Sequence, residues 1–141
     1  GASYELEIYP VIRRCPGLLP GVYHYDPQSH ALEPIRAETF DSQRLIADAT
    51  VYSGGKAVPD VLLMITARFQ RVSYKYESIA YATILKNVGA LYQTMYLVAT
   101  AMKLAPCALG TGDSERFSEI IGENFYKESA VGEFMLGDMR R

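Results

Sequence analysis

The chain has 141 residues, of which 49% are hydrophobic and 21% are charged, and its formal net charge at pH 7 is -2. A chain of this length forms one domain that buries roughly two-thirds of its unfolded surface, so we expect a single domain over residues 1–141. The balanced charge lacks the basic excess that attracts nucleic acid or an anionic membrane surface, and we expect neither as a partner.

The cysteine content indicates a reducing compartment. Cys15 and Cys107 lie far apart in the sequence, and the sequence shows no secretory-signal pattern. Such a pair does not form a disulfide framework, so we expect free thiols and a cytoplasmic protein.

The chain opens directly on a strand pattern, without an initial methionine. Residues 5–12 alternate in polarity and place Leu6 and Ile8 on one face of a predicted strand. Residues 21–27 and 30–36 are rich in strand formers and flank a turn, which predicts a β-hairpin. Because structure begins at once, we expect a fragment, a processed chain or one subunit of a larger enzyme.

A short helix and a buried strand follow the hairpin. Asp41 is placed to cap a helix over residues 42–49. Residues 61–67 form a continuous apolar run of strand length, which predicts a central strand buried on both faces. Nearer the end of the chain, we expect a strand at residues 107–109, a helix at 113–122 and a strand at 131–136.

The longest predicted element is a helix within residues 77–104. Its apolar residues recur in steps of four and three and share one face: Ile84, Val88, Leu91, Met95, Val98 and Met102. The other faces are also mainly apolar, as is typical of a buried helix, while Lys86 and Asn87 argue against a membrane span. Gly89 indicates that another helix or a flat ligand packs close to the backbone.

The order of these elements predicts the fold class. Strands and helices interleave, and the early hairpin argues against an all-parallel sheet. We therefore predict an α+β fold in which a mixed, largely antiparallel sheet packs around the long buried helix.

Three groups of residues are candidates for chemistry. His24 and His30 have no supporting metal ligands at a suitable spacing, so we interpret them as surface residues of the hairpin and predict no metal site. Residues 110–112 lack the third glycine of a dinucleotide fingerprint, but they join a strand to a helix, where backbone N–H groups face a ligand or simply form a turn.

The third group is the stretch 71–76, which combines two cations with two phenols. The ammonium of Lys75 favours the phenolate of a neighbouring Tyr76, which could then serve as a base. Adjacent residues of a helix do not face each other, so the two side chains could also point apart.

Taken together, these stretches resemble the nitroreductase superfamily of flavin enzymes. The resemblance is greatest to its SagB-type branch, which includes the azoline (thiazoline and oxazoline) dehydrogenases of modified-peptide biosynthesis. It runs from Gly1 to Gly137 and rests on the succession of five segments: Gly-Ala-Ser-Tyr-Glu-Leu-Glu-Ile-Tyr at 1–9, the hairpin at 21–33, Val-Gly-Ala-Leu-Tyr-Gln at 88–93, Gly-Thr-Gly-Asp at 110–113 and Val-Gly-Glu-Phe-Met-Leu-Gly at 131–137.

The resemblance implies an FMN cofactor, held where two subunits of a dimer meet and pack their central helices together. It implies that Ala2 and Ser3 lie near the polar edge of the isoalloxazine ring. It also implies that Leu109, Gly110 and Thr111 lie against the ring near N5.

The resemblance assigns catalysis to Lys75 and Tyr76, which match the Lys-Tyr pair of azoline dehydrogenases. It implies that Tyr76, aided by Lys75, removes a proton from the azoline ring carbon as a hydride passes to N5, which leaves an aromatic azole. Arg140 matches a late contact to the FMN phosphate.

One family element is absent from the sequence. The early Arg-Arg-Ser-x-Arg element that grips the FMN phosphate has no counterpart, since Arg13 and Arg14 are misplaced and lack the serine. We therefore predict that this chain alone binds FMN weakly, and that a homodimer or a larger complex supplies the missing N-terminal part. Two alternatives to azoline oxidation stay open: an NAD(P)H-dependent nitroreductase or flavin reductase, and a flavin-free scaffold subunit of a peptide-modifying complex.

Overall fold

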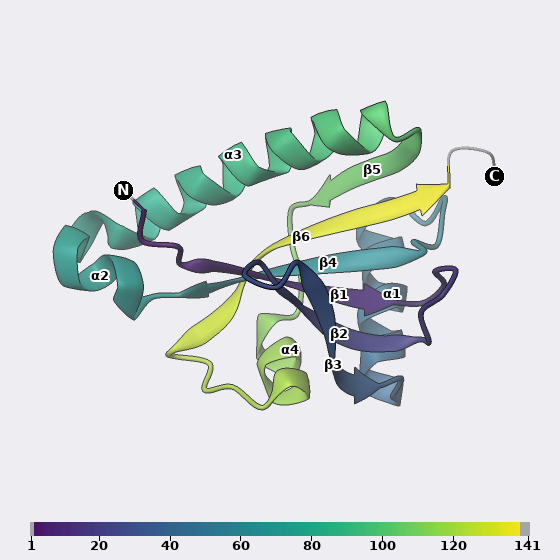
Figure 1. Cartoon of the computed structure of the whole chain (residues 1–141), viewed down its shortest axis with the longest axis horizontal. Helices are drawn as coiled ribbons and strands as arrows, with labels where there is room; N and C mark the ends of the chain where they lie inside the picture. The colour runs from purple at the N-terminus through teal and green to yellow at the C-terminus, as the bar shows by residue number, and fades with distance from the viewer. Residues whose placement is uncertain (1, 139–141) are drawn as a thin grey trace.

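A computed structural model describes residues 2–138 (Figure 1). Its elements are, in chain order, β1 (Leu6–Ile12), β2 (Gly21–Asp26), β3 (Ala31–Ala37), α1 (Phe40–Tyr52), β4 (Val61–Arg68), α2 (Gln70–Tyr76), a short 3₁₀ helix (Glu77–Ile79), α3 (Ala80–Ala101), β5 (Leu104–Leu109), α4 (Ser114–Ile121) and β6 (Glu128–Asp138). Within this part of the chain, no helix is long and apolar enough to cross a bilayer.

The strands form one six-stranded sheet in the order β3-β2-β1-β4-β6-β5. Each pair of neighbouring strands is antiparallel. The predicted α+β class is confirmed, and the sheet is antiparallel in every described pair. Strand β6 lies between β4 and β5, so the last described element joins the edge strand β5 to the centre of the sheet.

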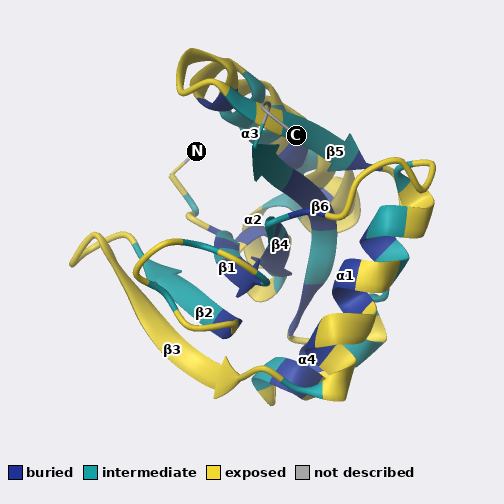
Figure 2. Cartoon of the chain, turned by 90° about the vertical axis from the view of Figure 1, so that its right-hand side faces the viewer, coloured by how far each residue is buried: buried dark blue, intermediate teal, exposed yellow. Residues whose placement is uncertain are grey.

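Helices cover both faces of the sheet (Figure 2). On one face, Leu45 of α1 and Phe117 of α4 pack against Leu62 and Met64 of β4. On the other face, residues of α2 and α3 pack against the next residues of the same strand, including Ile65. The predicted burial of β4 on both faces is confirmed, because successive residues of a strand point to opposite sides.

Helix α1 begins earlier than predicted. Its N-cap is Thr39, whose side chain accepts a hydrogen bond from the backbone of Ser42, while the Ser42 hydroxyl bonds back to the backbone of Thr39. Asp41 lies in the first turn, where its charge complements the helix dipole, so the prediction that it caps the helix is wrong. By contrast, the helix predicted at 113–122 is confirmed: Asp113 caps α4, and Gly122 ends that helix with a φ of 73°.

The prediction that α3 is buried on all sides is wrong for this chain. Its buried residues are Ala80, Ile84, Val88 and Ala99. Val98 and Met102 of the predicted core face are 53% and 65% exposed. A Cβ added to Gly89 would meet no atom within 4 Å. Within the described chain, α3 contacts one face of the sheet and, near its start, α2, and most of its remaining surface is exposed.

Helix α3 lies very close to β6. A Cβ on Gly132 would stand 2.5 Å from the hydroxyl of Tyr92 and 2.9 Å from Cγ1 of Val88. The same Tyr92 oxygen accepts a hydrogen bond of 2.7 Å from the backbone N–H of Glu133. Only glycine leaves room for this approach, so we infer that Gly132 fixes the distance between helix and sheet.

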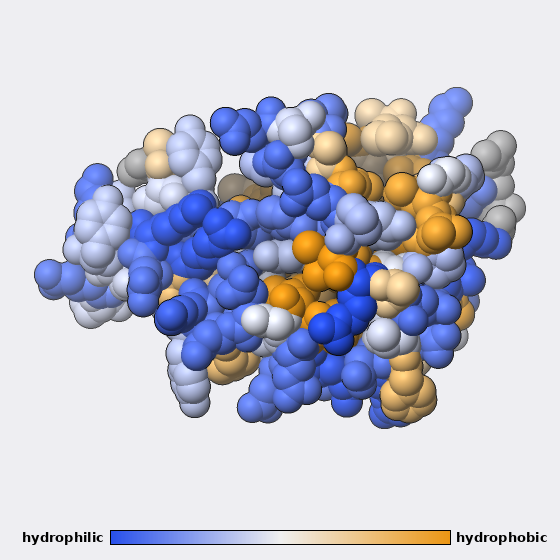
Figure 3. Space-filling model, turned by 60° about the horizontal axis from the view of Figure 1, so that its bottom comes forward, coloured by the Kyte–Doolittle hydropathy of each residue, from blue (hydrophilic) through white to orange (hydrophobic). Residues whose placement is uncertain are grey.

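The β2–β3 hairpin extends away from the core. Every residue of β3 is exposed, whereas β2 begins with the buried pair Gly21 and Val22. Figure 3, which brings the lower side of Figure 1 forward, shows a largely hydrophilic face with apolar side chains gathered near its middle and in its upper right part. The hairpin is thus a projecting edge of the sheet rather than part of its core.

The close contact at Gly132 leads to a stability prediction. Gly132→Ala should lower the free energy of unfolding by about 1–3 kcal/mol, because the added methyl overlaps Tyr92 and Val88. Urea denaturation followed by circular dichroism measures this change. Gly137→Ala is the matched control, since a Cβ there meets nothing within 4 Å. Equal losses in the two variants would contradict the assignment.

Candidate active site

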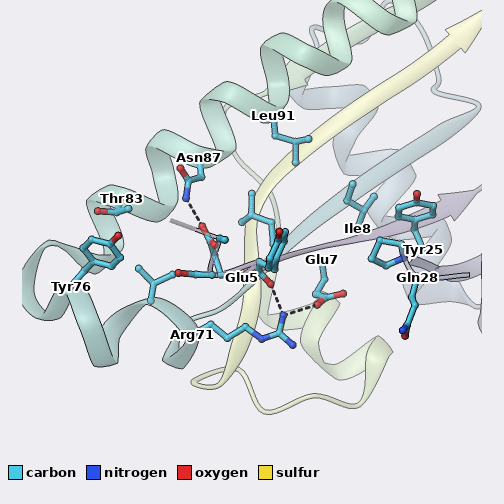
Figure 4. A pocket seen from close by; sticks show the side chains of 16 residues that line it. Glu5, Glu7, Ile8, Tyr25, Gln28, Arg71, Tyr76, Thr83, Asn87 and Leu91 are labelled. Atoms are coloured by element: carbon cyan, nitrogen blue, oxygen red, sulfur yellow. Dashed lines mark hydrogen bonds and ion pairs between the residues drawn. The ribbon is translucent and has the colours of Figure 1, made fainter. Parts of the chain in front are cut away.

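A large cavity of about 1220 Å³ lies beside the start of the chain (Figure 4). Its walls come from residues 2–8, the tip of the β2–β3 hairpin, α2 and α3. Small-molecule sites commonly occupy roughly 300–1000 Å³, so this space is large enough for a bulky cofactor together with part of a substrate.

The cavity combines apolar and polar walls. Leu6 and Ile8, on the predicted common face of β1, line it together with Leu91 of α3. Polar side chains of Gln28 and Thr83 line other parts of the wall. A planar ring with a polar edge fits such a site, because its faces need apolar contact and its edge needs hydrogen-bonding groups.

The N-terminal wall of the cavity is tied to the helices. Asn87 of α3 donates a hydrogen bond to the carboxylate of Glu5, and Arg71 of α2 donates one to the backbone carbonyl of Tyr4. Arg71 also lies 3.6 Å from Oε1 of Glu7. These polar contacts hold the segment before β1 in place although its backbone has few ladder partners.

Behind this wall, Arg68 joins two buried carboxylates. Its Nη1 lies 3.0 Å from Glu7 Oε1, and its Nε lies 3.0 Å from Glu128 Oε2. Glu128 also accepts hydrogen bonds from the hydroxyls of Tyr9 and Thr66. Burial and the neighbouring Glu128 carboxylate raise the pKa of Tyr9, so this phenol remains a hydrogen-bond donor.

The interpretation of His24 as a surface residue is wrong. Its Nε2 lies 2.8 Å from Glu7 Oε2, its side chain is 18% exposed, and its ring centre lies 4.7 Å from that of Tyr9 with the two planes tilted by 36°. His30 is exposed, and its Nδ1 lies 2.8 Å from the Tyr25 hydroxyl. Among the described residues, no group of three or more metal-ligating side chains is assembled.

Strained backbone borders the cavity. Ala2, Tyr4 and Glu77 have φ values of 57°, 49° and 44°. These left-handed conformations are uncommon outside glycine and concentrate at functional sites. Helix α2 ends at Tyr76, the predicted base, and the strained residue Glu77 follows it directly.

The structure brings several predicted site residues together. Tyr76 lines the cavity with Ala2 and Ser3. The Lys75 ammonium lies 5.5 Å from the centre of the Tyr76 ring, so the two side chains are in contact although they are adjacent in α2. Lys75 itself is exposed and does not line the cavity.

The second predicted group of flavin contacts lies elsewhere. Leu109 is 7% exposed and belongs to the core beneath α1 and α4. Thr111 borders a separate, small cavity together with Glu133. Gly110 follows Leu109 and is exposed. The chain therefore does not place these three residues in the cavity that Ala2 and Ser3 line. The predicted phosphate contact, Arg140, falls outside the described residues.

Sequence reasoning missed the polar anchors Glu5, Glu7, Arg71 and Asn87. Glu5 and Glu7 alternate with Leu6 along β1, which is the usual pattern of a strand with one solvated face. Their partners lie up to 82 residues away in the sequence, so no local spacing reveals the pairing.

Comparisons with known proteins extend these observations. A sequence model of the nitroreductase family matches residues 4–137. A protein of Methanocaldococcus jannaschii, designated a candidate nitroreductase, is 30% identical over 121 residues, which cover 86% of this chain and 60% of that protein. The chain thus spans less than two-thirds of the length of this curated relative.

Solved structures share the fold. A candidate nitroreductase from Anabaena variabilis superimposes with a TM-score of 0.83 at 24% identity, over 99% of this chain and 28% of that one. A chain of the Escherichia coli microcin synthetase McbBCD complex with truncated pro-MccB17 bound superimposes with a TM-score of 0.79 at 24% identity, over 99% of this chain and 53% of that one. A candidate nitroreductase from Ralstonia eutropha superimposes with a TM-score of 0.72 at 18% identity, over 94% of this chain and 57% of that one.

The solved structures show that the fold is shared, and the sequence model shows membership of the family. The family match covers β1 to β6 and includes every wall of the large cavity except its first two residues, Ala2 and Ser3. This chain belongs to the nitroreductase family.

Proposed function

We propose that the protein is an FMN-dependent oxidoreductase that oxidises azoline rings of a modified peptide to azoles. The observation that carries this proposal is the position of Tyr76, which lines the large cavity with the Lys75 ammonium 5.5 Å from its ring. The fold shared with the microcin synthetase complex, solved with truncated pro-MccB17 bound, supports a peptide substrate.

The cavity has the features that a flavin requires. Leu6, Ile8 and Leu91 would pack against the faces of the ring, and the backbone of Ala2 and Ser3 would meet its polar edge. When bound, FMN supplies the acceptor for one substrate hydrogen together with its electron pair. The apolar side chains keep water away from the reacting carbon, which strengthens electrostatic interactions there.

In the proposed reaction, the azoline ring loses two hydrogens. One leaves as a proton and is accepted by the phenolic oxygen of Tyr76, while the other leaves with its electron pair. The Lys75 ammonium stabilises the phenolate by which Tyr76 accepts the proton. The hydrogen bond from Arg71 to Tyr4 and that from Asn87 to Glu5 keep the opposite wall in position during this transfer.

We further propose that each flavin is held by two subunits. Within one chain, Leu109, Gly110 and Thr111 do not share the cavity lined by Ala2 and Ser3. If Leu109, Gly110 and Thr111 of a second copy lie against the ring, both predicted sets of flavin contacts can be made at one site. A dimer would also cover α3, where Leu97 and Met102 are 64% and 65% exposed. The weak FMN binding predicted for the isolated chain and the phosphate contact of Arg140 remain predictions.

The first test concerns the proposed base. Tyr76→Phe and Lys75→Gln in the full-length holoenzyme should lower the rate of azole formation by about 10²–10⁴-fold, because proton removal loses its acceptor or the charge that stabilises it. Mass spectrometry of the peptide measures the loss of two hydrogens. Tyr74→Phe, at a phenol that is 79% exposed and outside the cavity, should retain activity. Full activity of Tyr76→Phe would rule out the assigned role.

The second test separates the candidate activities. The purified full-length protein should be yellow, and anaerobic NADPH should not bleach its flavin rapidly. Absorbance spectroscopy measures both properties. Rapid bleaching would instead identify an NAD(P)H-dependent reductase, and a colourless protein would identify a flavin-free subunit.

The third test addresses the shared flavin site. Leu97→Glu combined with Met102→Glu should yield a monomer that has lost bound FMN, because buried, unpaired charge opposes association. Sedimentation measures the mass, and absorbance measures the flavin. Val51→Glu, an equivalent change at a 69% exposed position of α1, should leave both unchanged. A monomer that keeps one FMN per chain would contradict the proposal.

A further inference from the structure

Glu133 is a buried carboxylic acid in the middle of β6. Its backbone pairs with Leu109 on one side and Met64 on the other, and its N–H donates to the Tyr92 hydroxyl. The residue is 8% exposed. Within the described part of the chain, no hydrogen bond or ion pair from the protein reaches its carboxyl group, and neither carboxyl oxygen is fully shielded from solvent, so the group keeps a small contact with water.

The carboxyl group packs beneath the segment 110–112, which we call the glycine loop. A Cβ on Gly112 would overlap Oε1 and Cδ of Glu133. The space around them is about 10 Å³, which is at the lower limit for one water molecule. Leu45, Leu62 and Leu109 form apolar walls of this space. The loop and the acid therefore touch directly, with little room for solvent between them.

The charged groups around this space do not compensate an ionised Glu133. Helix α1 contributes Asp48 and Tyr52, and the start of α4 contributes Asp113. Two cations lie nearby: Arg116 is 3.2 Å from Asp48 and 3.3 Å from Asp113, and Arg44 is 3.2 Å from Asp48, so both already pair with other carboxylates. An ionised Glu133 would add a third negative charge. In agreement, burial raises the pKa of Glu133 to about 7.

We propose that Glu133 is a positioning residue for the glycine loop, which it supports as a neutral acid and disturbs as a carboxylate. The neutral acid packs against Gly112 without an electrostatic cost. A carboxylate in the same place needs hydrogen-bond donors, and the backbone N–H groups of the adjoining glycine loop are donors of this kind. Ionisation would draw these groups inward, away from any ligand on the outer side of the loop.

This inference rests on the proposed function in one respect, since the glycine loop is the segment proposed to contact the flavin of the second subunit. The direction in which pH changes the order of the glycine loop follows from the neutral form of Glu133 that the site favours. The loop is ordered below about pH 7, where Glu133 is neutral, and loosens as the pH rises through that value. Flavin affinity should fall over the same range.

Hydrogen–deuterium exchange tests the inference without requiring activity. In the full-length protein, exchange of the segment 109–113, corrected for the intrinsic effect of pH, should rise about tenfold between about pH 6 and about pH 8.5. Glu133→Gln, which has the same shape and cannot ionise, should show no rise. Glu119→Gln, at an exposed acid of α4, should behave like the unaltered protein.

A second variant keeps the inference testable if Glu133→Gln folds poorly. Gly112→Ala inserts a methyl group where the carboxyl group packs, so the loop should exchange rapidly at both pH values. The inference would be overturned if exchange in the unaltered protein did not depend on pH. It would also be overturned if exchange in Glu133→Gln rose with pH as in the unaltered protein. FMN titration over the same range distinguishes the two proposals. If exchange depends on pH but FMN does not bind at any pH, the role of Glu133 stands and the flavin proposal fails.

Discussion

The arrangement of the large cavity depends on the pairing of Arg68 with Glu7 and Glu128. Both carboxylates are buried, and removing their shared cation would leave Glu128 with hydroxyl donors only and Glu7 with the more distant Arg71 and with His24. The three residues belong to β1, β4 and β6, so one guanidinium fixes neighbouring strands in register. Through Glu7, the same network reaches His24 on the hairpin and Arg71 on α2, which are the two sides of the cavity.

Helix α3 has two contrasting sides. Its inner side is matched closely to the sheet, since Gly132 admits Tyr92 and the hydroxyl of Tyr96 accepts a hydrogen bond from the backbone of Ala108. Its outer side presents Leu97, Val98 and other large apolar residues to solvent. One side of the helix is thus closely packed within the chain, while the other exposes large apolar residues of the kind that protein interfaces bury.

The sequence predicted those features that depend on local patterns. The apolar run at 61–67 identified β4, and Asp113 with Gly122 identified both ends of α4. Burial of α3 was misjudged, because an apolar face does not reveal whether its partner belongs to the same chain. The contact of Lys75 with Tyr76 and the pairing of Glu5 with Asn87 depend on rotamers and on distant packing, which no spacing in the sequence encodes. The separation of the glycine loop from Ala2 and Ser3 likewise emerged only from the sheet order.

The projecting hairpin shapes the rim of the cavity. Its tip contributes Tyr25, Pro27 and Gln28 to the rim of the cavity, while β3 contributes no buried residue. Insertions or exchanges there would remodel what the rim admits without disturbing the packing beneath it. Pro34 interrupts the donors of this outermost strand and discourages unwanted pairing between molecules. The entrance of the cavity and the interior of the domain are therefore largely independent of each other at this edge of the sheet.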